Sequence, residues 1–321
     1  MTTRTTAIDA HTFTEIEFEV GDPGPHDLLV EVRAVSVNPA DHKVRTGLEG
    51  PGVLGYDAAG VVREVGADVT AYAPGDEVYY AGTIDRPGSN AGFQLVDEHI
   101  VGRKPSTLGW AEAAALPLTT ITAWEALFDA LRLGPGSTGR LLVVSAAGGV
   151  GAMVTQLAKT LTGVEVIGTA SREESAAFAR SMGADHIADH TTLVESVRKV
   201  APDVQYVFSP VSGRNVEAYA ELLTPRGEIV AIDEPPGMDL LPLKSKSLTW
   251  HWELMFTRPL YQPTDATQRE LLNRVADLVD EGRIRTTLTQ TYEGLTGANL
   301  EAAHRQLESG RTIGKVALTV R

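Results

Sequence analysis

One glycine-rich turn constrains the fold of this chain more than any other feature. The turn reads SAAGGVG (145–151), and it follows an apolar run, LLVVSA (141–146), that is typical of a buried strand. After the turn, apolar side chains recur at helical spacing on one face, at Val150, Val154, Leu157, Ala158 and Leu161. A strand, a tight glycine turn and an amphipathic helix predict the first βα unit of a parallel sheet.

Strands and helices continue to alternate after this unit. Strands are predicted at 164–169, 185–190, 204–209, 228–232 and 248–252, and helices at 173–182, 193–200 and 216–223. The fold class is therefore α/β, with a doubly wound parallel sheet of Rossmann type in the strand order 3-2-1-4-5-6. A further amphipathic helix is predicted at 265–282, where Gly282 stops it.

The first third of the chain has a β pattern instead. Apolar residues alternate from Leu28 to Ala34, and short strands at 58–65, 77–81 and 92–96 are separated by turn residues, which is typical of a small irregular barrel. The 321 residues fit two domains at roughly 150 residues each. We place a β-barrel domain at 1–116, completed by a returning tail at 284–321, and the Rossmann domain at 117–283.

Composition excludes several classes of protein. With 28 basic and 42 acidic residues, the net charge of −14 disfavours nucleic acid as a partner. The chain has no cysteine, which excludes disulfides, iron–sulfur clusters, thiolate nucleophiles and cysteine-ligated zinc. No segment is typical of a signal peptide or a membrane span, so a cytoplasmic protein is expected.

The glycine turn also predicts a dinucleotide site. Its spacing is A-x-G-x-x-G, in which Gly148 lets a pyrophosphate approach the backbone and Gly151 lets the helix pack closely on the strand. Free N–H groups at the helix start then face the phosphates. The alternative is a tight turn without a ligand. The candidate cofactor-binding residues here are Ala147, Gly148, Gly149, Val150 and Gly151.

The end of the second Rossmann strand predicts which dinucleotide binds. An NAD site normally has an acidic residue there for the ribose 2′-hydroxyl, but this sequence reads GTASR (168–172). Ser171 and Arg172 suit a 2′-phosphate, so NADP(H) is the expected cofactor. Ser171 with Glu174 also fits a capping box, and Arg172 fits a solvated first-turn residue. Ser209, at the end of the strand at 204–209, is a further candidate in this domain.

Several further motifs, in this order along the chain, resemble the medium-chain dehydrogenase/reductase superfamily. The likeness is greatest to its zinc-free, quinone oxidoreductase-like branch, which includes zinc-type alcohol dehydrogenase-like proteins. It implies a GroES-like catalytic domain built from both chain ends, an inserted Rossmann domain, an active site in the cleft between them, and homodimers or tetramers joined through the Rossmann sheet edge. The motifs are NPAD (38–41), GYDAAGVV (55–62), GDEV (75–78), ALP (115–117) followed by Thr122-Ala123, and GKV (314–316).

The resemblance also bears on metal chemistry. Zinc-dependent relatives have a cysteine where Asn38 stands, a histidine where Tyr56 stands, and a four-cysteine lobe that this chain lacks. Asparagine and tyrosine are poor zinc ligands, so no metal site is expected. The pair His186-x-x-x-His190 lies on a strand and turn without further ligands. Relatives often have tyrosines between the first two motifs, whereas residues 44–54 here contain no aromatic side chain.

Without a Lewis acid, conjugate reduction is the easiest chemistry, because hydride addition to a quinone or an α,β-unsaturated carbonyl gives a delocalised anion. The candidate catalytic residues are Tyr56, as donor or proton relay, and Asn38, which orients cofactor and substrate. Packing and an Asn-Pro turn are their structural alternatives. Thr120 and Thr122 are candidate nicotinamide contacts or helix-start residues, and Lys315 is a candidate cofactor contact or a surface charge.

We therefore expect an NADPH-dependent reductase of quinones or enones, with a small molecule as substrate and neither nucleic acid nor membrane as partner. A metal-free carbonyl or alcohol oxidoreductase and a non-catalytic NADPH-binding protein are the alternatives. Polar loop residues His42, Lys43 and Arg45 are further candidates near the same site. The aromatic cluster at 250–261 is expected to line either the substrate pocket or a homodimer interface at the edge strand.

Overall fold

A computed structural model describes residues 3–320, which divide into two compact units. Of these residues, unit 1 comprises 3–121 and 256–320, and unit 2 comprises 122–255. No helix in the described part of the chain is both long enough and apolar enough to cross a membrane.

Unit 1 is a β-rich domain built from both ends of the chain. Its main sheet has the order β14-β15-β3-β4-β5-β7, with β6 paired to β3, and β1 and β2 form a separate hairpin. The strands are β1 (Thr3–Asp9), β2 (Thr14–Gly21), β3 (Asp27–Ser36), β4 (Ala58–Val65), β5 (Glu77–Tyr80), β6 (Phe93–Asp97), β7 (Val101–Arg103), β14 (Leu288–Tyr292) and β15 (Lys315–Thr319). The helices are α1 (Pro39–Thr46), the short 3-10 turn η1 (Glu98–Ile100), α2 (Trp110–Ala114), α8 (Thr257–Tyr261), α9 (Thr267–Asp280) and α10 (Gly297–Glu308).

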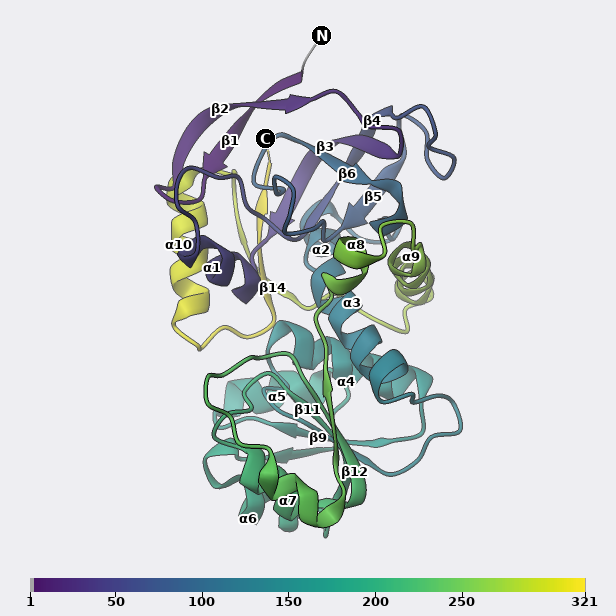
Figure 1. The fold of residues 1–321 in the computed structure, drawn as a ribbon, viewed down its shortest axis with the longest axis vertical. Coiled ribbons are helices and arrows are strands. Elements are labelled where there is room, and N and C mark those ends of the chain that lie inside the picture. The colour runs from purple at the N-terminus through teal and green to yellow at the C-terminus, as the bar shows by residue number, and fades with distance from the viewer. Residues whose placement is uncertain (1–2, 321) are drawn as a thin grey trace. The chain divides into compact units, whose positions relative to one another are not determined.

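The predicted return of the C-terminal tail is confirmed. β15 pairs antiparallel with β3, so Ala317 lies opposite Ser36, and the yellow end of the chain runs beside the purple β3 (Figure 1). The central position of β3 follows from its sequence, because Leu28, Val30 and Val32 are almost fully buried. Their side chains form one apolar core with residues of β4, β5, α10 and β15. The tail is therefore part of the domain core.

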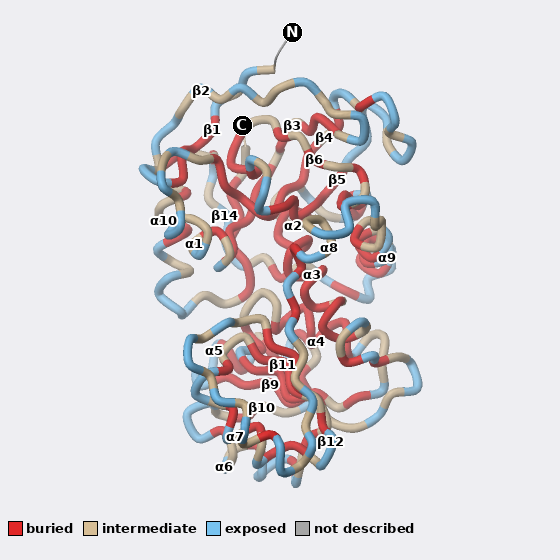
Figure 2. The backbone as a smooth tube through the Cα atoms, viewed as in Figure 1, coloured by how far each residue is buried: buried red, intermediate tan, exposed pale blue. Residues whose placement is uncertain are grey.

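Unit 2 is the predicted Rossmann domain. Its six strands are all parallel and have the order β10-β9-β8-β11-β12-β13, which confirms the predicted order 3-2-1-4-5-6. The six strands are β8 (Arg140–Val143), β9 (Glu165–Thr169), β10 (His186–Ala188), β11 (Val204–Ser209), β12 (Leu223–Ala231) and β13 (Thr249–Trp252). The inner strands β9 and β11 are drawn mainly as buried backbone in Figure 2. The helical segments are the π-helical η2 (Glu125–Ala130), α4 (Gly149–Leu161), α5 (Glu173–Ser181), η3 (His190–Thr192), α6 (Leu193–Arg198), α7 (Val216–Leu222) and η4 (Leu241–Lys246).

The division between units differs from the expected domain limits at 117 and 283. Helix α3 (Pro117–Trp124) contains one division, after Ile121, and residues 256–283 belong to unit 1. Helix α9 has the predicted amphipathic pattern, but its apolar face covers the barrel, where the Tyr79 hydroxyl donates to the carbonyl of Leu272 at 2.7 Å. The helical periodicity of α9 identifies its buried face but not the domain that packs against that face. The domain boundary could therefore be determined only from the tertiary packing.

Candidate functional site

The glycine turn of unit 2 has the geometry of a dinucleotide-binding loop. Ser145 adopts a left-handed backbone conformation (φ 57°), which turns the chain sharply at the end of β8. The Ser145 N–H donates to the Thr169 hydroxyl at 2.9 Å, and the Gly148 N–H donates to the Ser145 carbonyl at 2.9 Å. The first bond joins the turn to the end of β9, and the second closes the turn itself. Residues 149–151 then form the first turn of α4, where N–H groups have no partner inside the helix.

The two glycines of the predicted spacing differ in the space available for a side chain. A Cβ at Gly151 would lie 2.3 Å from the Ser145 carbonyl oxygen and 2.9 Å from the Cα of Ala146, so only glycine lets α4 pack on this turn. A Cβ at Gly148 would meet the Ser145 oxygen at 3.4 Å, an ordinary contact. Space inside the fold therefore requires Gly151 but not Gly148, and the absence of a side chain at Gly148 leaves the outer face of the turn open.

The region after β9 differs in one detail from the sequence analysis. Helix α5 has Arg172 at its N-cap and begins at Glu173, so the Ser171 capping box is wrong by one residue. Ser171 and Arg172 are both exposed, directly beyond the carboxyl end of β9. The segment from Thr169 to Arg172 contains no acidic residue. The two candidate phosphate contacts thus lie where ligands bind to sheets of this type.

Ser209 is placed differently from the other cofactor candidates. Its side chain is fully buried, with its hydroxyl 2.7 Å from the Tyr219 hydroxyl and accepting from Ser212 at 3.0 Å. The hydroxyl therefore holds β11 to α7 and the loop between them. Cofactor binding by this side chain is not supported, because both contacts are internal to unit 2.

Unit 1 contains a buried polar cluster centred on Lys315, Asp57 and Asn38. The Lys315 ammonium donates to Asp57 Oδ2 at 2.9 Å, to the Val37 carbonyl at 2.8 Å and to Asn38 Oδ1. Lys315 is 3% exposed, so the surface-charge alternative for this residue is wrong. Burial raises the pKa of Asp57, and the adjacent ammonium opposes that rise. The two buried charges are tolerated away from water because each compensates the other.

Asn38 organises this cluster through its backbone and its side chain. Its amide nitrogen Nδ2 donates to Asp57 Oδ2 at 2.8 Å and to the carbonyls of Tyr56 and Ser36 at 3.2 and 3.3 Å. Asn38 is also the N-cap of α1, with Pro39 in the first helical turn. The predicted Asn-Pro break after β3 is confirmed. Since the amide is fully engaged and 1% exposed, Asn38 positions its neighbours in this structure.

Asp41 is a buried carboxyl group with one unused oxygen. Its Oδ2 accepts from the Asn38 backbone N–H at 2.6 Å, whereas Oδ1 is buried without a hydrogen-bond partner. Burial raises the pKa of Asp41 to about 7, and the nearby Asp57 carboxylate contributes to the rise. A carboxyl group of this pKa exchanges a proton near neutral pH, which suits acid–base chemistry.

Tyr56 and Thr120 carry two further unpartnered polar atoms. Both side chains are almost completely buried, and neither hydroxyl has a hydrogen-bond partner among the described residues. The Tyr56 ring packs edge-on against Phe256 at a centroid distance of 5.3 Å. Burial and, secondarily, the negative charge of Asp41 raise the pKa of Tyr56 far above neutrality, so its hydroxyl remains a donor. Buried orphan groups of this kind often mark a functional site.

Helix α3 corrects the alternatives given for the two threonines. The helix begins at Pro117, so Thr120 and Thr122 lie inside it and do not start it. The Leu118 N–H donates to Asp57 Oδ1 at 2.7 Å, which ties the helix to the charged cluster. Thr120 belongs to unit 1 and the buried Thr122 to unit 2.

Sequence reasoning missed the roles of Asp41 and Asp57, although both lie in motifs that it singled out. The spacing N-x-x-D is a signal for Asp41, because an acidic residue at the third helical position pairs with the N-cap backbone. Asp57 has no local signal, since its partner Lys315 is 258 positions away. The candidates His42, Lys43 and Arg45, expected on a loop, lie on helix α1 instead, and His42 and Arg45 both contact Glu308 of α10, at 2.8 and 3.0 Å.

The remaining sequence features are dispersed. His186 pairs with Glu165 at 2.8 Å, and no cluster of potential metal ligands in the described residues includes His186 or His190. The aromatic cluster is divided, because Phe256 packs on Tyr56 in unit 1 while Trp252, on edge strand β13, is 56% exposed.

Comparison with known proteins identifies the family to which both parts of the chain belong. Residues 24–124 match the alcohol dehydrogenase GroES-like domain, and residues 182–318 match the zinc-binding dehydrogenase model. A zinc-type alcohol dehydrogenase-like protein of Staphylococcus aureus strain COL is 40% identical over 94% of each chain. The chain belongs to the medium-chain dehydrogenase/reductase superfamily. It is thus an oxidoreductase of a nicotinamide-dependent family, with the GroES-like and Rossmann domains described above.

Several solved structures and a further curated protein are similar to most or all of this chain. A putative zinc-dependent alcohol dehydrogenase from Rhizobium etli CFN 42 has a TM-score of 0.94 and 46% identity, covering 100% of this chain and 99% of its own. The quinone oxidoreductase of Coxiella burnetii has a TM-score of 0.84 and 26% identity, over 99% and 100%. A mycobacterial protein complexed with NADPH has a TM-score of 0.84 and 27% identity, over 98% and 99%. The 2-methylene-furan-3-one reductase of Solanum lycopersicum is 30% identical over 95% of this chain and 74% of its own length.

Proposed function

We propose that this protein is an NADPH-dependent reductase that transfers hydride, without zinc, to a quinone or an α,β-unsaturated carbonyl compound. The observation that carries the proposal is the buried Asn38–Asp57–Lys315 cluster beside the unpaired Tyr56 hydroxyl. The cluster offers no ligand set for a metal because its polar groups bond to one another, whereas the Tyr56 hydroxyl is an unused donor, and conjugate reduction needs only such a donor.

The preference for NADPH rests on the residues that follow β9. A carboxylate at that position would bind the ribose 2′-hydroxyl of NAD and repel a phosphate, and none occurs up to Arg172. The exposed Arg172 guanidinium suits a dianionic 2′-phosphate. One structural relative binds NADPH, which agrees with this assignment.

The catalytic zinc implied by the family does not fit the residues in this chain. Asn38 Oδ1 and Asp57 Oδ2 both accept from the Lys315 ammonium, so a cationic group already neutralises the oxygens that could face a metal. Tyr56 adds only a neutral phenol, because burial raises its pKa. Neutral amide and phenol groups are weak ligands for zinc compared with thiolate and imidazole.

The chain's own residues supply the remaining chemistry. NADPH, when bound, supplies the hydride. The N–H groups at the start of α4 and the Arg172 side chain hold its phosphates. The Tyr56 hydroxyl donates a hydrogen bond to the substrate carbonyl as negative charge develops there. Asp41, with a pKa of about 7, holds a proton near neutral pH. It is our candidate for the source of the proton that the substrate takes up after hydride transfer.

Two named relatives favour these substrate classes. One is a quinone oxidoreductase and another reduces 2-methylene-furan-3-one, in which a carbon–carbon double bond is conjugated to a carbonyl. A metal-free carbonyl or alcohol oxidoreductase remains the second candidate, because the Asp41 carboxyl and the Tyr56 hydroxyl would also support an alkoxide. A non-catalytic NADPH-binding protein is disfavoured by the unpaired polar atoms retained at this site.

We also propose a cytoplasmic homodimer formed through the edge of the Rossmann sheet. Within the described residues β13 pairs only with β12, and it ends in Trp252, followed by Leu254, which are 56% and 55% exposed. An edge strand with exposed apolar side chains is suited to cover by a second copy. Sedimentation of the wild type and of Trp252→Glu tests this assembly. A monomeric wild type would contradict it.

The experiment that tests the reductase follows NADPH absorbance with a panel of quinones, enones, aldehydes and secondary alcohols. We expect saturable NADPH oxidation with quinones or enones, weaker activity with NADH, and no loss after treatment with EDTA. Activity confined to alcohols with NADP⁺ would support the second candidate. Absence of saturable NADPH binding would exclude both enzymatic assignments.

A further inference from the structure

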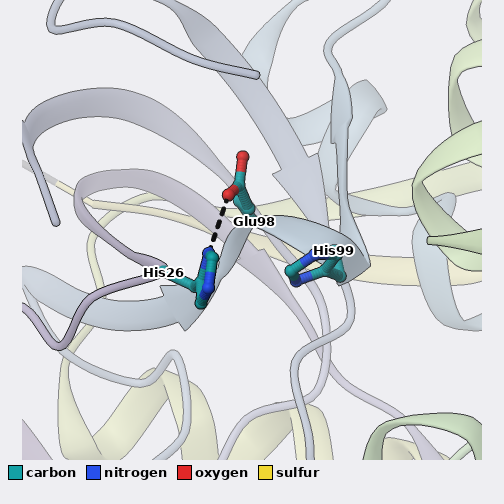
Figure 3. Close-up of side chains that lie close together, drawn as sticks. All are labelled: His26, Glu98 and His99. Carbon is teal, nitrogen blue, oxygen red and sulfur yellow. Dashed lines mark hydrogen bonds and ion pairs between the residues drawn. The ribbon is translucent and has the colours of Figure 1, made fainter. Parts of the chain in front are cut away.

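Three potential metal ligands converge in unit 1, apart from the candidate reductase site. They are His26, directly before β3, and Glu98 and His99 in the short turn η1. Each offers a ligand atom, and these atoms lie within 4.8 Å of one another. Figure 3 shows the Glu98 carboxylate close to the His26 ring, and the His99 ring extending toward His26.

The Glu98 carboxylate is held in place by the backbone. Its Oε2 accepts from the N–H groups of Thr70 and Ala71 at 3.2 and 3.0 Å, and the side chain is 2% exposed. These bonds leave Oε1 directed at His26 Nδ1, 3.1 Å away. Two ligands of a tetrahedral zinc ion lie about 3.3 Å apart, given bond lengths near 2.0–2.1 Å. The His26–Glu98 pair therefore already has the spacing that a shared ion requires.

His99 is oriented by a carboxylate of its own. Its Nδ1 lies 2.7 Å from Asp97 Oδ1, which also accepts the His99 backbone N–H at 2.8 Å. A carboxylate on one ring nitrogen fixes the tautomer and makes the other nitrogen, Nε2, the better metal ligand. The His26 and His99 rings meet edge to face at a centroid distance of 5.3 Å. The ligand atoms of the two histidines and of Glu98 therefore lie close enough together to share one ion.

We propose that His26, Glu98 and His99 bind one divalent transition-metal ion, and that Zn²⁺ suits this donor set best. Two imidazoles and one carboxylate are a common zinc ligand set, and a water completes the tetrahedron. The ion would join the loop before β3 to η1, segments 72 residues apart, and would stabilise unit 1. The sequence analysis expected no metal site because Asn38 and Tyr56 are poor zinc ligands, and no local spacing links His26 to Glu98.

A simple ion pair between His26 and Glu98 is the competing interpretation. It accounts for the 3.1 Å contact but not for the third ligand, nor for the Asp97 carboxylate behind that ligand. The Arg269 guanidinium lies 3.7 Å from Glu98 Oε2, on the oxygen that the backbone already occupies, so Oε1 remains the ligand atom. The two histidine side chains are 44% and 16% exposed, which lets the rings turn inward by the small amount that binding requires.

The direct test is metal binding by the full chain, without a histidine tag and stripped with EDTA. Titration with ZnCl₂ in a calorimeter should give one ion per chain, and the same addition should raise the melting temperature. Co²⁺ should give visible absorption bands of a tetrahedral site. No saturable binding of Zn²⁺, or binding without any change in melting temperature, would overturn the proposal.

Matched variants locate the ion. His26→Ala and His99→Ala should each abolish stoichiometric binding, and Asp97→Asn should weaken Zn²⁺ affinity about 10- to 100-fold while keeping an oxygen for the His99 N–H. His190→Ala removes a histidine outside the cluster and should bind as the wild type does. Circular dichroism of the stripped variants shows whether they fold. Unchanged binding in folded His26→Ala and His99→Ala would refute the assignment.

Discussion

The Lys315 ammonium and the Asp57 carboxylate form an ion pair of 2.9 Å in which the side chains are only 4% and 0% exposed. The two residues are 258 positions apart and lie at the start of β15 and just before β4. Their pairing ties the returning tail to the barrel at the candidate site. Breaking such a pair is costly, because the partner that remains keeps its charge away from water.

Lys315→Met should therefore lower the free energy of unfolding at pH 7 by about 3–5 kcal/mol. Chemical denaturation measures this change. The control is Lys199→Met, which removes a lysine from an exposed pair with Glu195 and should leave the denaturation midpoint unchanged. Adding Asp57→Asn to Lys315→Met should recover part of the loss, since it removes the unpaired charge. A lysine variant as stable as the wild type would contradict the buried pair.

Asp41 should make stability depend on pH. Burial raises its folded pKa to about 7 from 3.8, so the folded state holds a proton that the unfolded state releases. Stability from this group is complete below pH 3.8 and is lost as pH rises through 7, by about 4 kcal/mol in all. Asp41→Asn removes the effect and keeps an oxygen for the Asn38 N–H. The difference in unfolding free energy between the two proteins should therefore grow from pH 5 to 8, and parallel curves would exclude a raised pKa.

Tyr56→Phe tests the proposed donor to the substrate carbonyl. Because the hydroxyl has no partner in the described structure, its removal should not lower stability, while kcat should fall about 100-fold with little change in NADPH affinity. Tyr80→Phe is the matched control, since Tyr80 is also buried with an unpartnered hydroxyl. Equal turnover in the two variants would make Tyr56 a packing residue.

Local sequence signals were sufficient for most of the fold. The order of the Rossmann strands, the break at Asn38-Pro39 and the return of the C-terminal tail to the first domain were all predicted, because they follow from the fold class of an alternating pattern, from proline and from the strand pattern of the tail. The limits of unit 1 were not. Helix α9 has an apolar face that suits either domain, and only its packing on β7 and η1 decides between them.

The candidate sites were predictable only in part. The glycine turn was predictable, because its residues are consecutive in the sequence and the roles of its glycines depend on whether a side chain would fit beside the backbone. Lys315 was singled out from its motif, but its pairing with Asp57 could not be predicted because charges far apart in sequence carry no shared pattern. For the same reason, the cluster of His26 with Glu98 and His99 could not be predicted from the sequence. Long-range electrostatic contacts require the fold itself.

The two glycines of the turn should respond differently to substitution by alanine. Gly151→Ala places a Cβ 2.3 Å from the Ser145 oxygen, so α4 must shift and stability should fall by about 1–3 kcal/mol. Gly148→Ala meets nothing closer than 3.4 Å and should fold normally, yet its methyl group should weaken NADPH binding at least about tenfold by blocking the pyrophosphate. Thermal unfolding and NADPH titration separate the two. Normal NADPH affinity in Gly148→Ala would argue against a pyrophosphate at this turn.

Arg172→Ala tests the choice between the two dinucleotides. A guanidinium that pairs with the 2′-phosphate contributes only to NADPH, so the variant should lose about tenfold or more in affinity for NADPH and almost nothing for NADH. Arg180→Ala is the control, because Arg180 lies on the same helix, is exposed, and contacts Glu173 only at 3.7 Å. Both dissociation constants come from titrations of cofactor fluorescence. Equal losses for NADPH and NADH would show that Arg172 acts on the turn or on α5, and the preference would then need another source.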